Sequence, residues 1–259
     1  LRKLNRLISI IALKEFKIET NHAIKELYLL NKKKNKINIS DLGYLIGPIL
    51  NAGGRLGKSN YAKELLSSDN HKLISKRSIE LVKLNEKRKK IEKRILDEIN
   101  FSKISNDNKD IIIYFNPNIN EGLIGIIAAR LKDYYNKPSI VITASGHILK
   151  GSARSIYGYN IGYAIKNLLD NNIILSGGGH NMAAGFTLME SNLKIFEDFI
   201  SNHFLKSGAY TNNISNYDSE ISSIAFNKNF YNDIKKLEPF GTGNPVPTFL
   251  LRGLRIIKP

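Results

Sequence analysis

The residues best suited to chemistry lie in a glycine-rich segment, Ser176–Leu188, whose sequence is SGGGHNMAAGFTL. The three glycines at 177–179 can adopt positive φ and bring backbone N–H groups close to a ligand, which predicts an anion-binding loop. His180 follows at once and can hydrogen-bond to a phosphate or carry a charge against it. An ordinary glycine turn between two strands, with an incidental histidine, explains this motif alone equally well.

Three arginines set among small residues offer related chemistry, because a planar guanidinium binds phosphate through two hydrogen bonds and a lysine cannot. They are Arg55 in NAGGR, Arg130 in IIAARL and Arg154 in GSARS. Pro48 argues against a long uninterrupted helix before the first of them. The segment from Asn51 is therefore expected to form a tight turn that presents Arg55, and the alternative is a helix C-cap followed by an exposed arginine.

The segment His147–Ser155 is expected to form a strand that ends in polar groups. Side chains alternate along a strand, so the hydroxyl of Ser152 and the guanidinium of Arg154 would share one face. Such a pair could bind a phosphate, with Ser155 directly after it. A solvent-facing strand edge is the alternative.

The composition favours a polyanionic partner. The formal net charge is +16 and the isoelectric point is about 9.8, although only 10 of the 39 basic residues are arginines and lysine runs are usually solvated surface. The chain has no cysteine, which excludes a disulfide framework and a cysteine metal site. It also has no signal peptide and no apolar run of about 18 residues, so we expect no membrane span and a cytoplasmic location.

Apolar periodicity predicts the elements that position these groups. A strand at Asp110–Phe115, a helix at Glu121–Tyr135 and a strand at Ser139–Thr143 form a β-α-β pattern, which is typical of a parallel pair. Asn120 and the two residues after it stand at the start of this helix, where an anion would bind. A helix from Asn70 to Ile99 has no glycine or proline and is expected to be a rigid connector between two domains.

Six motifs, taken in their order along the chain, resemble the RecJ family of single-strand-specific exonucleases in the DHH phosphoesterase superfamily. GGGH alone is shared with other DHH phosphoesterases and with the tails of alanyl-tRNA synthetases, whereas GSARS, NAGGR and PFGTGNP narrow the resemblance to RecJ. The resemblance covers essentially the whole chain. The motifs are NAGGR (51–55), LNEKR (84–88), EGLIGIIAARL (121–131), GSARS (151–155), GGGHNMAAG (177–185) and PFGTGNP (239–245).

The resemblance implies an α/β fold in four segments. Residues 1–68 would be the helical end of a DHH catalytic domain, and residues 69–106 the connector helix. Residues 107–207 would be a DHH-associated domain with a mixed sheet, and residues 208–259 the truncated start of an oligonucleotide-binding barrel region. The chain is thus expected to be a C-terminal fragment.

The activity implied by the resemblance is 5′→3′ hydrolysis of single-stranded DNA in repair and recombination, at a two-metal centre of Mn²⁺ or Mg²⁺. The chain has no Asp-His-His motif and no metal ligands of its own, so these ligands are expected upstream and the fragment alone is expected to be inactive. Ile119 and Asn120 stand where a Trp-His pair is expected, which removes any role for a histidine there.

The resemblance also implies which residues meet the substrate. The terminal phosphate of the strand would be surrounded by Asn51, Arg55, Arg130, Ser152, Arg154 and Ser155. Gly178, Gly179 and His180 would face the scissile phosphate, with His180 as the catalytic candidate. The implied partners are single-stranded DNA and a helicase or single-strand-binding protein, with the chain itself a monomer.

Two other functions compete with this interpretation. A different DHH phosphoesterase would cut oligoribonucleotides or cyclic dinucleotides, and it would share the GGGH motif but not PFGTGNP. A non-catalytic single-strand-binding protein would lack the metal domain altogether. The reading frame upstream of Leu1 separates the two classes, because an in-frame Asp-His-His motif supports the enzyme and a start codon there supports the binding protein.

Overall fold

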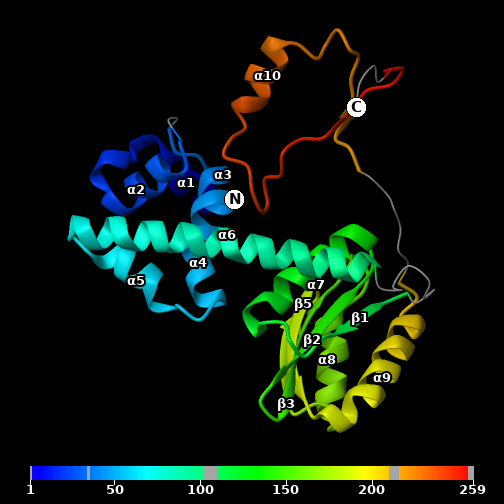
Figure 1. Ribbon diagram of the computed structural model, residues 1–259. Helices are drawn as coiled ribbons and strands as arrows, with labels where there is room; N and C mark the ends of the chain where they lie inside the picture. Colours follow the sequence, from blue (N-terminus) through cyan, green and yellow to red (C-terminus); the bar gives the residue numbers. More distant parts are fainter. Residues whose placement is uncertain (1, 34–35, 102–109, 210–215, 256–259) are drawn as a thin grey trace. The chain divides into compact units, whose positions relative to one another are not determined.

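The computed structural model describes residues 2–33, 36–101, 110–209 and 216–255 (Figure 1). The chain divides into two compact units, described separately below. The first unit comprises Leu1–Leu50, Glu64–Val82 and Ile214–Pro259, and the second comprises Asn51–Lys63 and Lys83–Asn213. These units do not coincide with the four predicted segments, whose boundaries stay a prediction.

The long predicted helix is present as α6, His71–Phe101, and it runs through both units (Figure 1). The side-chain oxygen of Asn70 caps it by accepting from the backbone N–H groups of Lys72 and Leu73, at 3.0 and 3.2 Å. Charged pairs one turn apart, such as Arg94 with Glu98, support its exposed surface. Among the described ranges, no helix combines the length and the apolar character that a membrane crossing requires.

The N-terminal part of the first unit is helical. Its elements are α1 (Lys3–Glu15), η1 (Ile18–Thr20), α2 (His22–Leu30), α3 (Ile39–Asp41), the π-helical turn η2 (Leu42–Ile46) and the start of α4 (Gly47–Arg55). Asn21 caps α2, since its side chain accepts from the N–H of Ile24 at 3.0 Å. The apolar stripe of α1 is exposed at Leu4, Leu7, Ile8 and Ile11.

The predicted tight turn at 51–55 is wrong, whereas the α-helix is interrupted ahead of Pro48, as predicted, by the π-helical turn η2. The helical turns from Ile39 to Arg55 follow one another without a gap, and the widened turn η2 shifts the register just before Pro48. Pro48 thereby becomes the second residue of α4, directly after the π-helical turn in which the N–H of Gly47 binds the carbonyl of Leu42. The chain turns only after Arg55, at Gly57 with φ 77°, before α5 (Asn60–Ser67).

The second unit is built on a five-stranded mixed sheet with the order β1-β2-β3-β5-β4. Its strands are β1 (Ile112–Phe115), β2 (Ser139–Ser145), β3 (Ile148–Arg154), β4 (Ser176–His180) and β5 (Ala183–Leu188). The pair β1–β2 is parallel and is connected through α7, Glu121–Tyr135, so the predicted β-α-β unit is confirmed. The other neighbouring strands are antiparallel.

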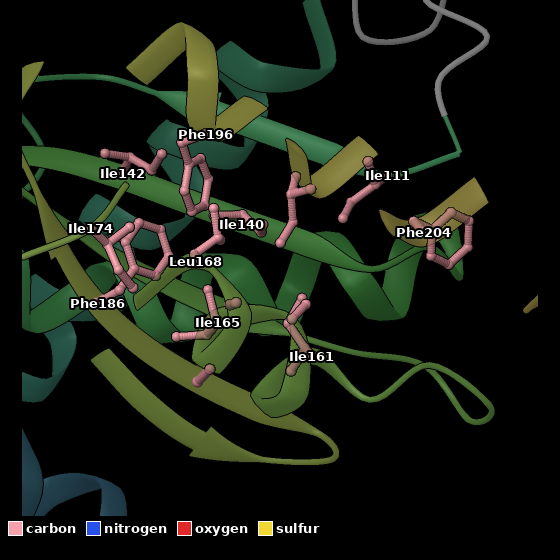
Figure 2. Packing of buried hydrophobic residues seen from close by; sticks show 14 of the residues in the cluster. Ile111, Ile140, Ile142, Ile161, Ile165, Leu168, Ile174, Phe186, Phe196 and Phe204 are labelled. Atoms are coloured by element: carbon pink, nitrogen blue, oxygen red, sulfur yellow. The ribbon is translucent and has the colours of Figure 1, made fainter. Parts of the chain in front are cut away.

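Helices cover both faces of this sheet. α8 (Ile161–Asp170) and α9 (Leu193–Lys206), the latter preceded by η3 (Glu190–Asn192), close one face over the apolar core of Figure 2. Phe186 of β5 stacks on Phe196 of α9 in this core, with ring centroids 4.6 Å apart. α7 and the C-terminal part of α6 pack on the other face, over β1–β3.

The C-terminal part of the first unit carries α10 (Lys228–Lys235) and two short parallel strands, β6 (Ser219–Glu220) and β7 (Phe249–Leu250). The apolar segment 248–257 favours a longer strand than β7, and its last two residues lie outside the described residues, as do six of the twelve residues of the polar segment 206–217, whose composition is typical of a linker. The loop after α10 is held by α1, because Arg6 Nη2 donates to the carbonyl of Leu237 at 2.9 Å.

Candidate nucleic-acid interface

One face of the three strands β3, β5 and β4 carries polar and small residues. Residues paired across neighbouring strands point to the same side of a sheet, so the register assigns three rows to this face. The opposite face carries Phe186 and the other apolar residues that pack on α8 and α9. The three rows are Lys150–Thr187–Ser176, Ser152–Gly185–Gly178 and Arg154–Ala183–His180.

Ser152 and Arg154 share this face and contact each other, as predicted. Arg154 Nη1 donates to Ser152 Oγ at 3.1 Å and to the carbonyl of Ala153 at 2.8 Å. Gly125 of α7 lies directly over the pair, since a Cβ there would stand 3.0 Å from Arg154 Nη2 and 3.2 Å from Ser152 Oγ. The guanidinium is thereby turned along the strand toward Ser152, and the two groups form what we call the anchor pair.

Arg55 extends from the last turn of α4 to the first turn of α7, and its charge acts on Arg154. Its Nη1 donates to the carbonyl of Gly122 at 3.0 Å, and Gly122 packs so tightly on the main chain of Arg55 that a Cβ would overlap it. This contact fixes the last turn of α4 against the first turn of α7. A glycine at position 122 is needed for that close approach.

The guanidiniums of Arg55 and Arg154 are an uncompensated pair of like charges. Burial lowers the pKa of Arg154, and the charge of Arg55 lowers it further. Burial and then the charge of Arg88 lower the pKa of Arg55, against a smaller opposing effect of Glu92. In the part of the chain that the structure describes, no carboxylate is bonded to either group. An anion bound here would relieve both the repulsion and the loss of hydration.

A pocket of about 500 Å³ opens beside this pair. It is lined by residues of strands β3, β4 and β5, by the end of α4 with the turn after it, and by the start of α7. One cation without a carboxylate partner, Arg55, and one ion pair, Lys150 with Glu121, line it. The lining residues are Gly54, Arg55, Gly57, Asn120, Glu121, Gly122, Ile124, Lys150, Gly151, Ser176, Gly177, Gly185, Phe186 and Thr187.

The predicted anion-binding loop at the three glycines is wrong. Residues 176–180 form strand β4, and none of the three glycines has positive φ. Gly177 and Gly179 are required for packing, because a Cβ at either would press into β5 or into the core beneath it. Gly178 has open space above it, and a Cβ at Gly185 beside it on β5 would make only an ordinary contact of 3.9 Å with the carbonyl oxygen of Gly151. The motif therefore presents a bare strand surface rather than a loop of converging N–H groups.

His180 ends β4 in the same row as Arg154, two strands and roughly 10 Å away. The ring is exposed, and its Nδ1 accepts a hydrogen bond from the N–H of Met182 at 3.3 Å. Nε2 is therefore the ring nitrogen that is available to a ligand. Gly162 of α8 supports the strand end, since a Cβ there would stand 2.9 Å from the main chain of His180. The structure thus fixes the backbone of His180 and leaves its imidazole accessible.

Three of the residues predicted to bind the terminal phosphate do not lie at the anchor pair. Arg130 Nε is paired with Glu92 at 2.8 Å, and Glu92 also binds Arg88 at 2.7 Å, so Arg130 belongs to a network between α6 and α7. Ser155 is buried and its hydroxyl donates to the carbonyl of Tyr159 at 2.7 Å, which is a structural contact. Asn51 is exposed on α4, one turn before Arg55, and does not line the pocket.

Two side chains hold the start of α7, where the sequence predicts an anion at Asn120 and the two residues after it, and only Thr143 was not singled out by sequence patterns. Thr143 of β2 is buried, and its hydroxyl donates to the carbonyl of Ile119 at 2.6 Å. Asn120 caps the helix by accepting from the N–H of Gly122 at 2.9 Å. At the position where a histidine is expected from the resemblance, the chain thus places a helix cap.

Lys150 is a further pocket residue that sequence patterns missed, and it pairs with Glu121, one of the residues predicted at the start of α7. Lys150 Nζ binds Glu121 at 2.6 Å, and this contact, followed by the charge of Lys150, lowers the pKa of the carboxyl group. Lys150 could have been found, because it precedes Ser152 and Arg154 at the same alternating spacing. The pairing of Lys150 with Glu121 could not, because the two residues lie 29 positions apart in the sequence.

The described residues do not fit a two-metal centre. Such a centre calls for a cluster of carboxylates and histidines, and within the ranges given above no three of these side chains gather into one. The described residues therefore supply no step of metal chemistry.

Two sequence profiles match the chain and define its class. The DHHA1 domain matches residues 108–205, and the RecJ OB domain matches residues 217–259. The chain is thus of the class in which a DHHA1 domain is followed by a RecJ OB domain. The chain belongs to the RecJ family.

Relatives and a solved structure agree with this membership. The RecJ exonuclease of Haemophilus influenzae is 32% identical over 235 residues, which are 85% of this chain and 40% of that protein. The RecJ exonuclease of Bacillus subtilis is 30% identical over 265 residues, covering 95% of this chain and 32% of that protein. The crystal structure of RecJ from Thermus thermophilus with Mn²⁺ superposes with a TM-score of 0.79 at 23% identity, over 90% of this chain and 34% of the other. The chain thus spans less than half the length of each.

Proposed function

We propose that this chain is the substrate-binding part of a 5′→3′ exonuclease that hydrolyses single-stranded DNA. Its relatives carry the name of single-stranded-DNA-specific exonucleases, and the chain spans 40% of the first of them. Hydrolysis would require the two-metal centre, Mn²⁺ or Mg²⁺, that residues other than those described would hold. The segments 1–68, 69–106, 107–207 and 208–259 would serve as catalytic-domain end, connector, DHH-associated domain and OB region.

The observation that carries this proposal is the uncompensated guanidinium pair beside Ser152. Arg154 is half-buried and donates a hydrogen bond to the neutral hydroxyl of Ser152, and the positive charge of Arg55 acts on it. A terminal phosphate brings about two negative charges and several acceptor oxygens, more than an internal phosphodiester does. This site therefore favours the phosphorylated 5′ end of a strand over its interior.

The bare strand surface extends this site toward His180. Gly185 and Gly178 lie in the row next to Arg154, Ala183 and His180, and no side chain rises from either glycine. A sugar–phosphate backbone can lie close to a glycine main chain, which is how such segments approach phosphates elsewhere. We propose that the strand passes over these glycines and that His180 Nε2 contacts a phosphate further along it.

The test is fluorescence anisotropy of the 259-residue chain with a short single-stranded DNA that ends in a 5′-phosphate or a 5′-hydroxyl, at one fixed salt concentration. We expect the phosphorylated strand to bind about tenfold more tightly, a difference of about 1.4 kcal/mol. Arg154→Met should abolish that preference while leaving the weaker, salt-dependent binding of the hydroxyl strand.

Arg130→Met is the matched control for the arginine substitution. Arg130 is paired with Glu92 instead of facing Ser152, so its loss should leave the preference for the phosphate intact. Equal binding of both strands by the unmodified chain would overturn the proposed end recognition. A preference that survives Arg154→Met and disappears in Arg130→Met would move the phosphate site to the α6–α7 network.

A non-catalytic single-strand-binding protein is the second candidate function, because the described residues offer no metal cluster. The reading frame upstream of Leu1 separates the two. An in-frame Asp-His-His motif there supports the exonuclease, and a start codon directly before Leu1 supports the binding protein.

A further inference from the structure

The pocket beside the anchor pair holds an ion pair that the proposed end recognition does not use. Lys150 Nζ and Glu121 Oε2 are 2.6 Å apart, and Ser145 Oγ lies 3.3 Å from the same carboxylate oxygen. Both charged residues line the pocket together with Arg55. Their side chains are half-exposed, at 38% for Lys150 and 52% for Glu121, so the pair can open without unfolding its surroundings.

Lys150 continues the row of side chains to which the anchor pair belongs. Lys150, Ser152 and Arg154 occupy alternate positions of β3 and point to one face, at a spacing of roughly 6.7 Å between successive side chains. That spacing is comparable to the phosphate repeat of an extended single strand. The guanidinium of Arg154 turns back toward Ser152, so the anchor pair and Lys150 are next neighbours on this face.

The surroundings of Lys150 suit a phosphodiester and its sugar. Thr187 of β5 and Ser176 of β4 complete its row, and their hydroxyl oxygens lie 2.7 Å apart. Both residues line the pocket, and the glycine row lies beside them. Hydroxyl groups and bare main chain accept a sugar–phosphate backbone without reading the base.

We propose that Lys150 is a second phosphate subsite, which binds the first internal phosphodiester of a strand whose 5′-phosphate sits at Ser152 and Arg154, and that Glu121 competes with this phosphodiester for Lys150. The inference rests on the proposed end recognition and adds a minimum substrate of two phosphates to it. Binding of the strand transfers Lys150 Nζ from the carboxylate to the phosphodiester.

The experiment compares two dinucleotides that differ only in the charge of the internal linkage. Both are 5′-phosphorylated thymidine dinucleotides, one with a phosphodiester and one with a neutral methylphosphonate, and their affinities for the 259-residue chain are measured by calorimetry. We expect the phosphodiester to bind about tenfold more tightly, as for one charge-assisted contact. Lys150→Met should reduce this ratio to below about twofold and lower the salt slope by about 1.

Glu121→Gln tests whether Glu121 competes with the phosphodiester for Lys150 or whether the ion pair has only a structural role. If Glu121 competes for Lys150, its neutralisation raises the ratio between the two dinucleotides above that of the unmodified chain. If the pair only fastens α7 to β3, Glu121→Gln and Lys150→Met both lower the thermal midpoint and neither changes the ratio, which would overturn the proposal. Lys150→Gln serves as a second variant should Lys150→Met fold poorly.

Lys166→Met is the matched control, because Lys166 is an exposed lysine on α8, which covers the opposite face of the sheet. The ratio of the affinities of this variant for the two dinucleotides should equal that of the unmodified chain. The failures of the two proposals are distinguishable: loss of the preference for a 5′-phosphate refutes the end recognition. The second subsite is refuted if this preference is intact but the two dinucleotides bind with nearly equal affinity. It is also refuted if Lys150→Met leaves the ratio of their affinities unchanged.

Discussion

The guanidinium of Arg55, the last residue of α4, donates a hydrogen bond of 3.0 Å to the carbonyl of Gly122 in the first turn of α7. The two main chains touch at this point, because Gly122 has no Cβ. This contact joins a residue of the NAGGR motif to the DHH-associated domain. It also sets the distance between the guanidinium and the anchor pair on β3.

Gly122→Ala should therefore weaken phosphate binding and lower stability. The added methyl group meets main-chain atoms of Arg55, which cannot rotate away, so α4 and α7 must separate. We expect a loss of about 1–3 kcal/mol of stability and a weaker preference for a 5′-phosphate. Urea unfolding and the anisotropy assay measure the two effects.

Gly43→Ala is the control for this substitution. Gly43 also lies in a helical turn, but no atom stands within 4 Å of a Cβ built there. Its replacement should leave stability unchanged or slightly raised. Equal behaviour of the two variants would show that the contact between Gly122 and Arg55 does not position the site.

Two neighbouring glycines of β4 should respond in opposite ways. Gly179→Ala places a methyl group against the main chain of Ala183 and Ala184, so it should destabilise the second unit by about 1–3 kcal/mol. Gly178→Ala faces open space and should leave the thermal midpoint nearly unchanged. If the strand passes over this surface, Gly178→Val should still weaken DNA binding severalfold, while its midpoint stays close to that of the unmodified chain.

The sequence supports some of these features and misses others for physical reasons. Alternation along β3 is a local property, so the shared face of Ser152 and Arg154 could be predicted. The glycine motif could not be assigned to a strand, because glycine permits both extended and positive-φ backbone and only the pairing with β5 decides between them. The roles of Arg130 and Ser155 depend on Glu92 and Tyr159, which are brought close by tertiary packing.

The helical segment before Arg55 was also difficult to predict from local sequence alone. Pro48 in isolation predicts a break, and only the π-helical turn ahead of it moves the proline into the first turn of α4. Long elements such as α6 and α7 were predictable, since uninterrupted apolar periodicity specifies them without tertiary information. Pairings that define the pocket, such as that of Lys150 with Glu121, require knowledge of which strand faces the helix.

Arg154→Met should stabilise the free protein slightly and abolish its response to phosphate. Burial and the charge of Arg55 both disfavour the charged guanidinium, so removing it relieves repulsion even though two hydrogen bonds are lost. We expect a change between 0 and about +1 kcal/mol in the free energy of unfolding. Thymidine 5′-monophosphate should raise the thermal midpoint of the unmodified chain but not that of the variant. A variant that is strongly destabilised would instead assign Arg154 to structural support.

The first unit should lose stability in acid through Asp41. Burial by itself would raise the pKa of this carboxyl, but hydrogen bonds from Lys33 and Tyr28 and the charge of Lys33 outweigh it and leave the pKa below its usual 3.8. Tyr28 donates to Asp41 Oδ2 at 2.7 Å, and Lys33 Nζ stands 2.9 Å from Oδ1. Because the folded pKa is depressed, the stabilisation is complete above about pH 4 and is lost as the pH falls through the folded value.

Asp41→Asn tests this linkage. At pH 7 the variant should be less stable by about 1–3 kcal/mol, since Lys33 and Tyr28 lose a charged partner. The difference from the unmodified chain should shrink as the pH falls below 3.8 and the carboxyl group of the folded state takes up its proton. Urea unfolding at pH 7 and pH 3 measures both quantities, and Tyr28→Phe, which keeps the ion pair with Lys33, should retain most of the pH dependence. A difference of equal size at the two pH values would mean that the side chain stabilises the helices through its shape and neutral hydrogen bonds, and not through its charge.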